Sequence, residues 1–199
     1  MDPESKYQFP DVVGNRTRFY GKQLLKNIQA MRKNSTDKLL FQSDDYDVYV
    51  RIIKECFALE VYSTFNNRRN EHIPKKVKMP GNILYTVVCK KRNSLGEVEE
   101  LEAKIIFGTP ESILAVLKDH NPTQGINTSY IERQNYNRRH FNARLRRKTM
   151  AFSKDYACLV AQLQLQRIYY NFCWNHHTLK KITGIPTSPA MAIQATDHL

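Results

Sequence analysis

The amino-acid sequence predicts an α/β fold, in which a mixed sheet is flanked by helices and carries an inserted β-hairpin. Two observations support this prediction. The first sixty residues alternate between strand-like and helix-like patterns, and two apolar segments further along the chain flank a turn. A chain of 199 residues can bury a core of its own, and its apolar content of 41% is typical of a folded protein.

The alternation begins with residues 5–14, SKYQFPDVVG, which have the composition of a strand with Pro10 at an edge or a bulge. Apolar side chains then recur at helical spacing over residues 17–33, and residues 38–43, KLLFQS, form a short apolar strand. A second helix follows, and its apolar face consists of Tyr49, Ile52, Ile53, Cys56 and Phe57. This order indicates a sheet with at least one parallel pair of strands.

The middle of the chain predicts a hairpin. Residues 83–91 and 97–108 flank the segment RNSLG, which closes a turn at Gly96. The preceding residues, 63–82, are basic and hold little apolar content, so we expect a loop there. Pro110 suits the first position of a short helix, because its missing N–H is not needed there.

The C-terminal part is predicted to be almost wholly helical from Ser129 to about Trp174. One face of its last helix consists of Tyr156, Leu159, Val160, Leu163 and Tyr170. The last residues, 183–199, contain two prolines, and we expect this tail to wrap the surface. We therefore expect one domain over residues 1–182, with the basic loop and hairpin inserted at 63–108, and a tail after it.

The composition favours a polyanionic partner. The formal charge is +12 and the isoelectric point is about 9.6, which is most simply explained by nucleic acid. The four cysteines lie far apart, so we expect free thiols rather than a zinc ribbon or a disulfide framework. Cys173, His176 and His177 come nearest to a metal cluster, although a helix end explains them more simply. We expect no membrane span and no secretory signal, and hence a cytoplasmic protein.

Three carboxylates follow the strand 38–43 directly, within the segment SDDYD of residues 43–47. In open α/β sheets, ligands bind at the carboxyl ends of strands, and carboxylate oxygens suit a hard divalent cation. An aspartate at this place can instead cap the next helix. From these residues alone capping is favoured, and metal binding is the alternative.

Glu132 has a similar pair of interpretations. Ser129-x-x-Glu132 matches a capping box, yet Glu132 is the single acid in a segment that holds seven Lys and Arg up to residue 148. So many cations need an external anion. Arg139 lies two helical turns beyond Glu132 on nearly the same face. A carboxylate beside an arginine can ligate a metal while the arginine holds a phosphate, an arrangement that phosphoryl transfer requires.

Four segments of the sequence carry a resemblance to a known family. They are SDDYDVY (43–49), INTSYIERQNYNRRHFNARLRRKTMAFSKD (126–155), YYNFCWNHH (169–177) and TSPAMAIQATDH (187–198). In this order they resemble the DDE transposases, most closely the insertion-sequence-one family with its archaeal and bacterial relatives. The resemblance covers most of the chain, and the block from INTSYIER to FSKD is specific.

The resemblance implies an RNase H-like catalytic domain in which three carboxylates bind two Mg²⁺ (or Mn²⁺) ions. The second family carboxylate falls on Asp44 and the third on Glu132, while Arg139 takes a basic position that contacts the DNA of the transposon end. Asp45 and Asp47 are candidates for supporting or capping roles. The expected DNA-binding residues are Arg133, Arg138, Arg139, Arg144, Arg146, Arg147 and Lys148.

The sequence also departs from the family pattern, which places its first aspartate on a strand upstream of the segment DPES. Here DPES begins at Asp2, so we expect a chain that lacks the first strand and its aspartate. The expected function is DNA transposition by metal-dependent strand cleavage and transfer, defective in this chain alone. The alternative is an inactive transposase fragment that binds DNA or a transposase. The expected partners are DNA and a second copy or a full-length transposase, and the expected location is the nucleoid.

Overall fold

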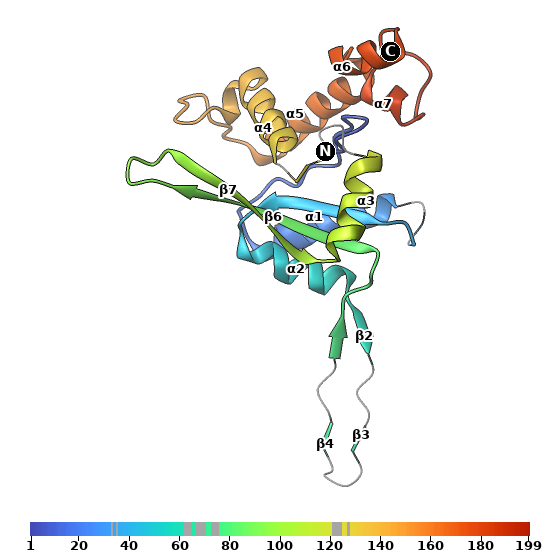
Figure 1. Ribbon diagram of the computed structural model, residues 1–199. Coiled ribbons are helices and arrows are strands. Elements are labelled where there is room, and N and C mark those ends of the chain that lie inside the picture. The colour runs from blue at the N-terminus through green and yellow to red at the C-terminus, as the bar shows by residue number, and fades with distance from the viewer. Residues whose placement is uncertain are drawn as a thin grey trace. The chain divides into compact units, whose positions relative to one another are not determined.

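The computed structural model describes residues 1–32, 34, 36–61, 65–66, 71–72, 76–120, 125–126 and 128–199 (Figure 1). The chain divides into two compact units. We call Gly14–Val116 the sheet unit, and Met1–Val13 together with Leu117–Leu199 the helical unit.

The sheet unit contains a three-stranded mixed sheet with the strand order β1-β6-β7. β1 (Leu39–Asp44) pairs in parallel with β6 (Ile83–Arg92), from Leu39 opposite Ile83 to Asp44 opposite Val88. β7 (Val98–Phe107) returns antiparallel to β6 across a turn at Gly96, whose φ of 82° suits glycine. The predicted α/β fold, the parallel pair and the hairpin are therefore confirmed.

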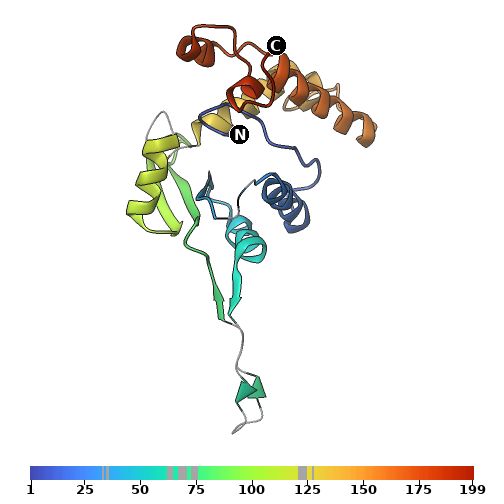
Figure 2. The same ribbon diagram turned by 90° about the vertical axis from the view of Figure 1, so that its right-hand side faces the viewer.

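Helices cover both faces of β6, the central strand. α1 (Arg18–Met31) and α2 (Asp47–Phe57) lie together on one face of the sheet (Figure 2). Their side chains form the core with those of the odd-numbered residues of β6. α3 (Pro110–His120) begins at the predicted proline, and up to Val116 it belongs to this unit. The core consists of Leu25, Ile52, Ile53, Phe57, Ile83, Tyr85, Val87 and Cys89.

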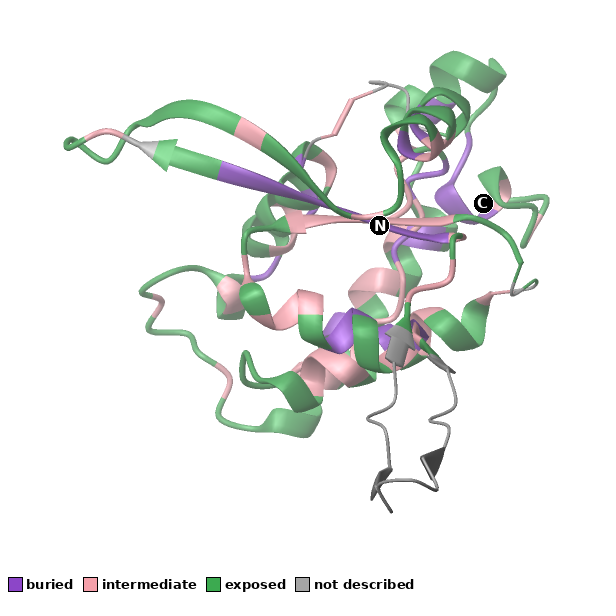
Figure 3. Cartoon of the chain, turned by 60° about the horizontal axis from the view of Figure 1, so that its bottom comes forward, coloured by how far each residue is buried: buried purple, intermediate pink, exposed green. Residues whose placement is uncertain are grey.

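Burial is uneven along the hairpin (Figure 3). The first seven residues of β6 are buried, whereas β7 is mostly exposed and presents Leu101 and Ile105 to solvent. The near-continuous apolar sequence of β6, ILYTVVC, is what a strand with two covered faces requires. The outer part of the hairpin therefore extends beyond the core.

The predicted basic loop over residues 63–82 is wrong in part. β2 (Leu59–Val61) pairs antiparallel with β5 (Lys76–Lys78), and β3 (Phe65–Asn66) pairs antiparallel with β4 (Glu71–His72). The alternation Lys76-Val77-Lys78 has the two-residue period of a strand, which its charge concealed. The rest of the prediction, at residues 63–64, 67–70 and 73–75, lies outside the described residues.

The stretch from Ser129 to about Trp174 is mostly helical, as predicted, but the prediction that one helix runs from Glu132 to Lys148 is wrong beyond Phe141. α4 (Ser129–Phe141) ends before Asn142, a short 3-10 turn, η1 (Ala143–Leu145), follows, and α5 (Tyr156–Ile168) begins anew. Buried Asn142 accepts a hydrogen bond from the Arg144 N–H, and Asp155 accepts one from the Cys158 N–H. Both side chains satisfy free N–H groups at a helix start, which stabilises the two breaks.

The strand predicted over residues 5–14 does not form. Instead, the Gln8 N–H donates to the Asn171 side-chain oxygen at 2.9 Å, and the Asn171 side-chain NH₂ donates to the Gln8 carbonyl at 3.0 Å. One amide side chain thus replaces the partner strand that the sequence led us to expect. Pro10, which has no N–H, lies two residues further on.

The C-terminal tail is only partly on the surface. α5 continues into a π-helical turn, η2 (Tyr169–Cys173), and then come α6 (His177–Thr183) and α7 (Pro189–Ala192). Residues 187–190 are buried, so a surface position is wrong for them. Ser188 caps α7 by accepting from the Met191 N–H, and Pro189 takes the first helical position.

Candidate metal and nucleic-acid site

Asp44 is the last residue of β1, at the carboxyl end of a parallel strand. Its side chain is 63% exposed, and one carboxylate oxygen lies 3.5 Å from the guanidinium of Arg16. Arg16 is itself held by Tyr46, whose ring lies 3.9 Å below the guanidinium and whose hydroxyl donates to the Arg16 carbonyl. Asp44 therefore lies at the edge where α/β sheets bind ligands, beside one cation.

The capping interpretation of Asp44 is wrong. The N-cap of α2 is Tyr46, and no side chain caps this helix end. Asp47 lies in the first turn, where a carboxylate suits the helix dipole, and Asp45 accepts a hydrogen bond from the Cys89 thiol at 3.4 Å. Aspartates at the end of β1 thus have three different surroundings.

Two phenols lie near Asp44, those of buried Tyr85 and half-buried Tyr49. The Ser43 hydroxyl lies 2.7 Å from the Tyr85 hydroxyl, and burial raises the pKa of Tyr85. Burial also raises the pKa of Tyr49, and the nearby Asp44 carboxylate raises it further. Both phenols stay protonated at neutral pH, so the negative charge in this place belongs to the aspartates.

Glu132 lies in the first turn of α4 and is exposed. The predicted box with Ser129 is wrong by one residue, because the N-cap is Thr128. The Thr128 hydroxyl donates to the Glu132 carboxylate at 2.9 Å, and the Glu132 N–H donates to the Thr128 carbonyl at 3.0 Å. The Glu132 carboxylate is therefore held over the start of α4 by a hydroxyl.

Asp44 belongs to the sheet unit and Glu132 to the helical unit. Their carboxylates are the oxygen ligands that Mg²⁺ and Mn²⁺ prefer, so their chemistry fits these ions. Among the residues that the structure describes, no group of three or more His, Cys, Asp or Glu side chains is arranged to hold a metal ion. This statement includes Cys173, His176 and His177, which the sequence suggested as the nearest approach to a cluster.

The basic residues that the sequence predicts as DNA-binding have different surroundings. Arg138 is 21% exposed and pairs with Asp11 at 2.5 Å and with the Gln8 side chain at 3.3 Å. Arg144 donates to the Ser153 hydroxyl at 3.2 Å. The exposed members are Arg133, Arg139, Arg144, Arg146, Arg147 and Lys148, and the last three follow η1 rather than continuing α4.

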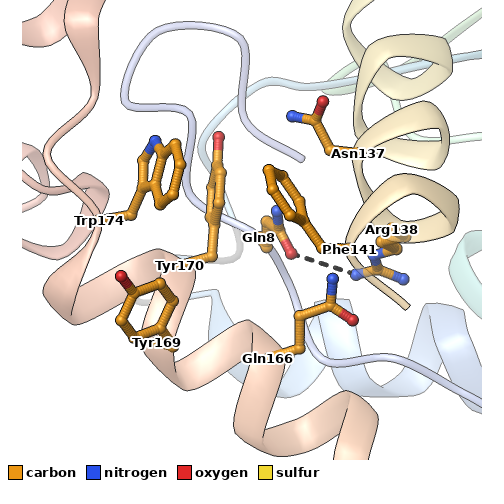
Figure 4. A pocket seen from close by; sticks show the side chains of 8 residues that line it. All are labelled: Gln8, Asn137, Arg138, Phe141, Gln166, Tyr169, Tyr170 and Trp174. Atoms are coloured by element: carbon orange, nitrogen blue, oxygen red, sulfur yellow. Dashed lines mark hydrogen bonds between the residues drawn. The ribbon is translucent and has the colours of Figure 1, made fainter. Parts of the chain in front are cut away.

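A pocket in the helical unit was missed by the sequence reasoning (Figure 4). It has a volume of about 150 Å³ and lies between α4, α5, η2 and the N-terminal segment. The sequence signal for this pocket is the aromatic segment YYNFCW, residues 169–174. One buried face of a helix cannot hold all of its aromatic side chains, so some of them remain to line a pocket. Its lining consists of Gln8, Asn137, Arg138, Phe141, Gln166, Tyr169, Tyr170 and Trp174.

No protein-family model, curated protein or solved structure matches this chain. Within the described residues, none of the helices has the length and the apolar content that crossing a bilayer requires. The likeness of the four motifs to transposases therefore stays a prediction.

Proposed function

We propose that this chain is a DNA-binding domain of the DDE-transposase type with an RNase H-like fold, which uses Mg²⁺ or Mn²⁺ to cleave and transfer DNA strands. The observation that carries the proposal is Asp44, an exposed carboxylate at the carboxyl end of a parallel strand, directly before a helix. Three helices and a mixed sheet of this order are compatible with such a fold. The motif likeness gives the second ligand as Glu132.

The residues of the chain have separable tasks in this proposal. The motif likeness gives Asp44 and Glu132 as ligands of the ion, which when bound would stabilise the charge that develops on the phosphate. The Thr128 hydroxyl orients the Glu132 carboxylate by donating to it. Exposed Arg139, Arg146 and Arg147 would neutralise phosphates of the DNA backbone and so position the DNA. The protein would then act in the cytoplasm, on the nucleoid.

The alternative is a module that binds DNA, a second copy or a full-length transposase without catalysis. The observation that favours it is the ion pair of Asp44 with Arg16, because a carboxylate already beside a cation attracts a metal ion less. This pair is exposed and hence weak, so a divalent ion can compete with it.

A calorimetric Mn²⁺ titration separates the two proposals. Asp44→Asn and Glu132→Gln should each weaken Mn²⁺ binding by roughly tenfold or more, because each removes a charged ligand. Arg16→Gln should strengthen binding, since it removes the competing cation. Asp119→Asn, at an exposed acid in α3, is the matched control and should change nothing. Identical titrations for all variants would leave only the binding module.

The DNA-binding part is tested by the salt dependence of affinity for a duplex. The logarithm of affinity should fall linearly with the logarithm of salt concentration. Replacing Arg146, Arg147 and Lys148 together by glutamine should flatten this slope by up to about three. An unchanged slope would show that this segment is a solvated surface, and absence of duplex binding would refute the proposed function.

A further inference from the structure

The pocket of the helical unit combines aromatic walls with amide side chains. The rings of Phe141 and Trp174 have centroids 5.8 Å apart, and that of Tyr169 lies 6.3 Å from Trp174. Figure 4 shows Phe141, Tyr170 and Trp174 around one space, with the amides of Asn137 and Gln166 at its edge. Phe141 and Tyr169 are 61% and 54% exposed, so their faces are accessible to a ligand.

One polar atom of this pocket lacks a partner. The side-chain oxygen of Gln166 is buried, and no hydrogen-bond donor for it exists among the described residues. Leaving a buried acceptor unpaired costs about 1–3 kcal/mol. That oxygen has almost no exposed surface, so a ligand would reach it only if the Gln166 amide turned, whereas the polar edge of a flat ring can meet the amides of Asn137 and Gln166 that line the pocket.

The size and the charge of the surroundings restrict the ligand further. A cavity of about 150 Å³ accepts one six-membered ring, as engineered cavities of that volume accept benzene. A line of aromatic side chains leads away from the pocket, because His140 stacks on Tyr136 at 5.8 Å and meets Phe141 at 5.2 Å. Arg133 lies over the Tyr136 ring, and Arg139 is exposed on the same helix.

We infer that this pocket takes one unpaired nucleobase of a nucleic-acid strand whose backbone follows the arginines of α4. Stacking on aromatic rings holds bases of single strands, and cations beside the rings hold the phosphates. An apolar side chain of a protein partner would fill the same volume, but it would offer no polar edge to the amides of Asn137 and Gln166 and no anion to exposed Arg139. The inference rests on the proposed function only in taking DNA as the polymer.

The chain offers a direct readout, because Trp174 is its single tryptophan and lines the pocket. The probe is a ten-residue oligothymidylate, whose pyrimidine ring fits the volume, titrated while the emission of Trp174 and the anisotropy of a labelled end are recorded. Stacking on the indole should quench the emission as the oligonucleotide binds. A duplex, whose bases are stacked on one another, should bind with much less quenching.

Variants establish the place of binding. Phe141→Ala keeps the tryptophan and should weaken oligothymidylate binding by roughly 5- to 150-fold, with duplex binding unchanged. Trp174→Ala should weaken it similarly, whereas Trp174→Phe keeps a ring and should retain most of the affinity. Phe152→Ala removes an exposed ring that does not line the pocket, and this matched control should have no effect. Circular dichroism checks that each variant is folded.

Two results would overturn the inference, and a third would change only the polymer that it names. Binding by anisotropy without quenching, equal in all variants, would refute the pocket and leave the proposed function intact. Absence of both oligothymidylate and duplex binding would refute the two together. Tighter, equally ring-dependent binding of an oligouridylate would keep the nucleobase but replace DNA by RNA as the polymer.

Discussion

The sheet unit and the helical unit are stabilised internally by different kinds of interaction. The sheet unit buries a continuous set of apolar side chains, with Ile52 fully buried and Ile53, Ile83 and Val87 at most 2% exposed. In the helical unit many of the buried side chains are polar, and Asn142 and Asn171 are 2% exposed. The buried polar residues of this unit are Ser5, Lys6, Gln8, Thr128, Gln134, Asn142, Asn171, Thr187 and Ser188.

Because of this difference, the sequence determines the structure of the two units in different ways. Apolar burial is non-directional, so periodicity along the chain suffices to define helices and strands around a core. Buried polar groups must be paired individually, which defines a single arrangement but depends on partners far along the chain. We expect the two units to respond differently to substitution, and the following experiments test this.

The largest effect should come from Ile52→Ala in the sheet unit. Removing most of a fully buried side chain should lower the free energy of unfolding by about 2–5 kcal/mol, through lost burial and the cavity left behind. Urea unfolding followed by circular dichroism measures it. Leu114→Ala, at a side chain that is 60% exposed, is the control and should change stability by less than about 0.5 kcal/mol. Equal effects would contradict an apolar core in this unit.

The corresponding change in the helical unit is Asn171→Ala. It leaves the Gln8 N–H and carbonyl without their partner and should cost about 1–3 kcal/mol of unfolding free energy. Urea unfolding followed by the emission of Trp174 reports on this unit, which contains the tryptophan. Gln164→Ala, at an exposed amide of α5, is the control. If both variants were equally mild, polar pairing would not hold the helical unit.

Two neighbouring arginines on α4 should separate stability from DNA binding. Arg138→Gln loses the pair with Asp11 and should cost about 1.5 kcal/mol of unfolding free energy, with little change in the salt slope of DNA binding. Arg139→Gln, at an exposed arginine, should leave stability within about 0.5 kcal/mol and lower the slope by about one. Equal changes in stability and in salt slope for the two variants would contradict the assignment of Arg138 to stability and of Arg139 to DNA binding.

The smallest effect concerns pH. Burial lowers the pKa of His176, and the nearby charges of Lys6 and His177 lower it further. The unfolded chain therefore binds a proton more readily, so the stability of the helical unit is full above pH about 6.5 and falls as the pH decreases towards the lower pKa of the folded state. His176→Gln should reduce this pH dependence in urea unfolding between pH 7.5 and 5.5. A wild-type stability that rises over this range on acidification would contradict the sign.

The contrast also explains what the sequence could predict. The sheet unit was predicted well because short, largely apolar runs, Leu39 to Phe41 and Ile83 to Cys89, start its two parallel strands. In the helical unit the breaks at Asn142 and Asp155 contain neither glycine nor proline, so a helical pattern ran through them. The strand expected over residues 5–14 failed because its partner is a single side chain, Asn171, that no local pattern reveals.

In the candidate site, too, local sequence patterns predicted positions, whereas contacts with distant residues could not be predicted. The position of Asp44 at a strand end followed from the apolar run before it. The hydrogen bond of Glu132 was misassigned because Thr128 and Ser129 are adjacent and either can begin a helix. The ion pairs of Asp44 with Arg16 and of Arg138 with Asp11 join residues distant in sequence, so charge counting could not tell bound arginines from exposed ones.

The hydrogen bonds between Gln8 and Asn171 also bear on the order in which the molecule assembles. The two residues are 163 positions apart, and the whole sheet unit is synthesised between them. During translation, roughly 8–30 s pass between the synthesis of Gln8 and that of Asn171. The sheet unit ends at Val116, so all its residues are synthesised before Asn171. Closing so long a loop is also slow in a refolding chain. We therefore expect the sheet unit to form first and the helical unit, with its pocket, to be completed last.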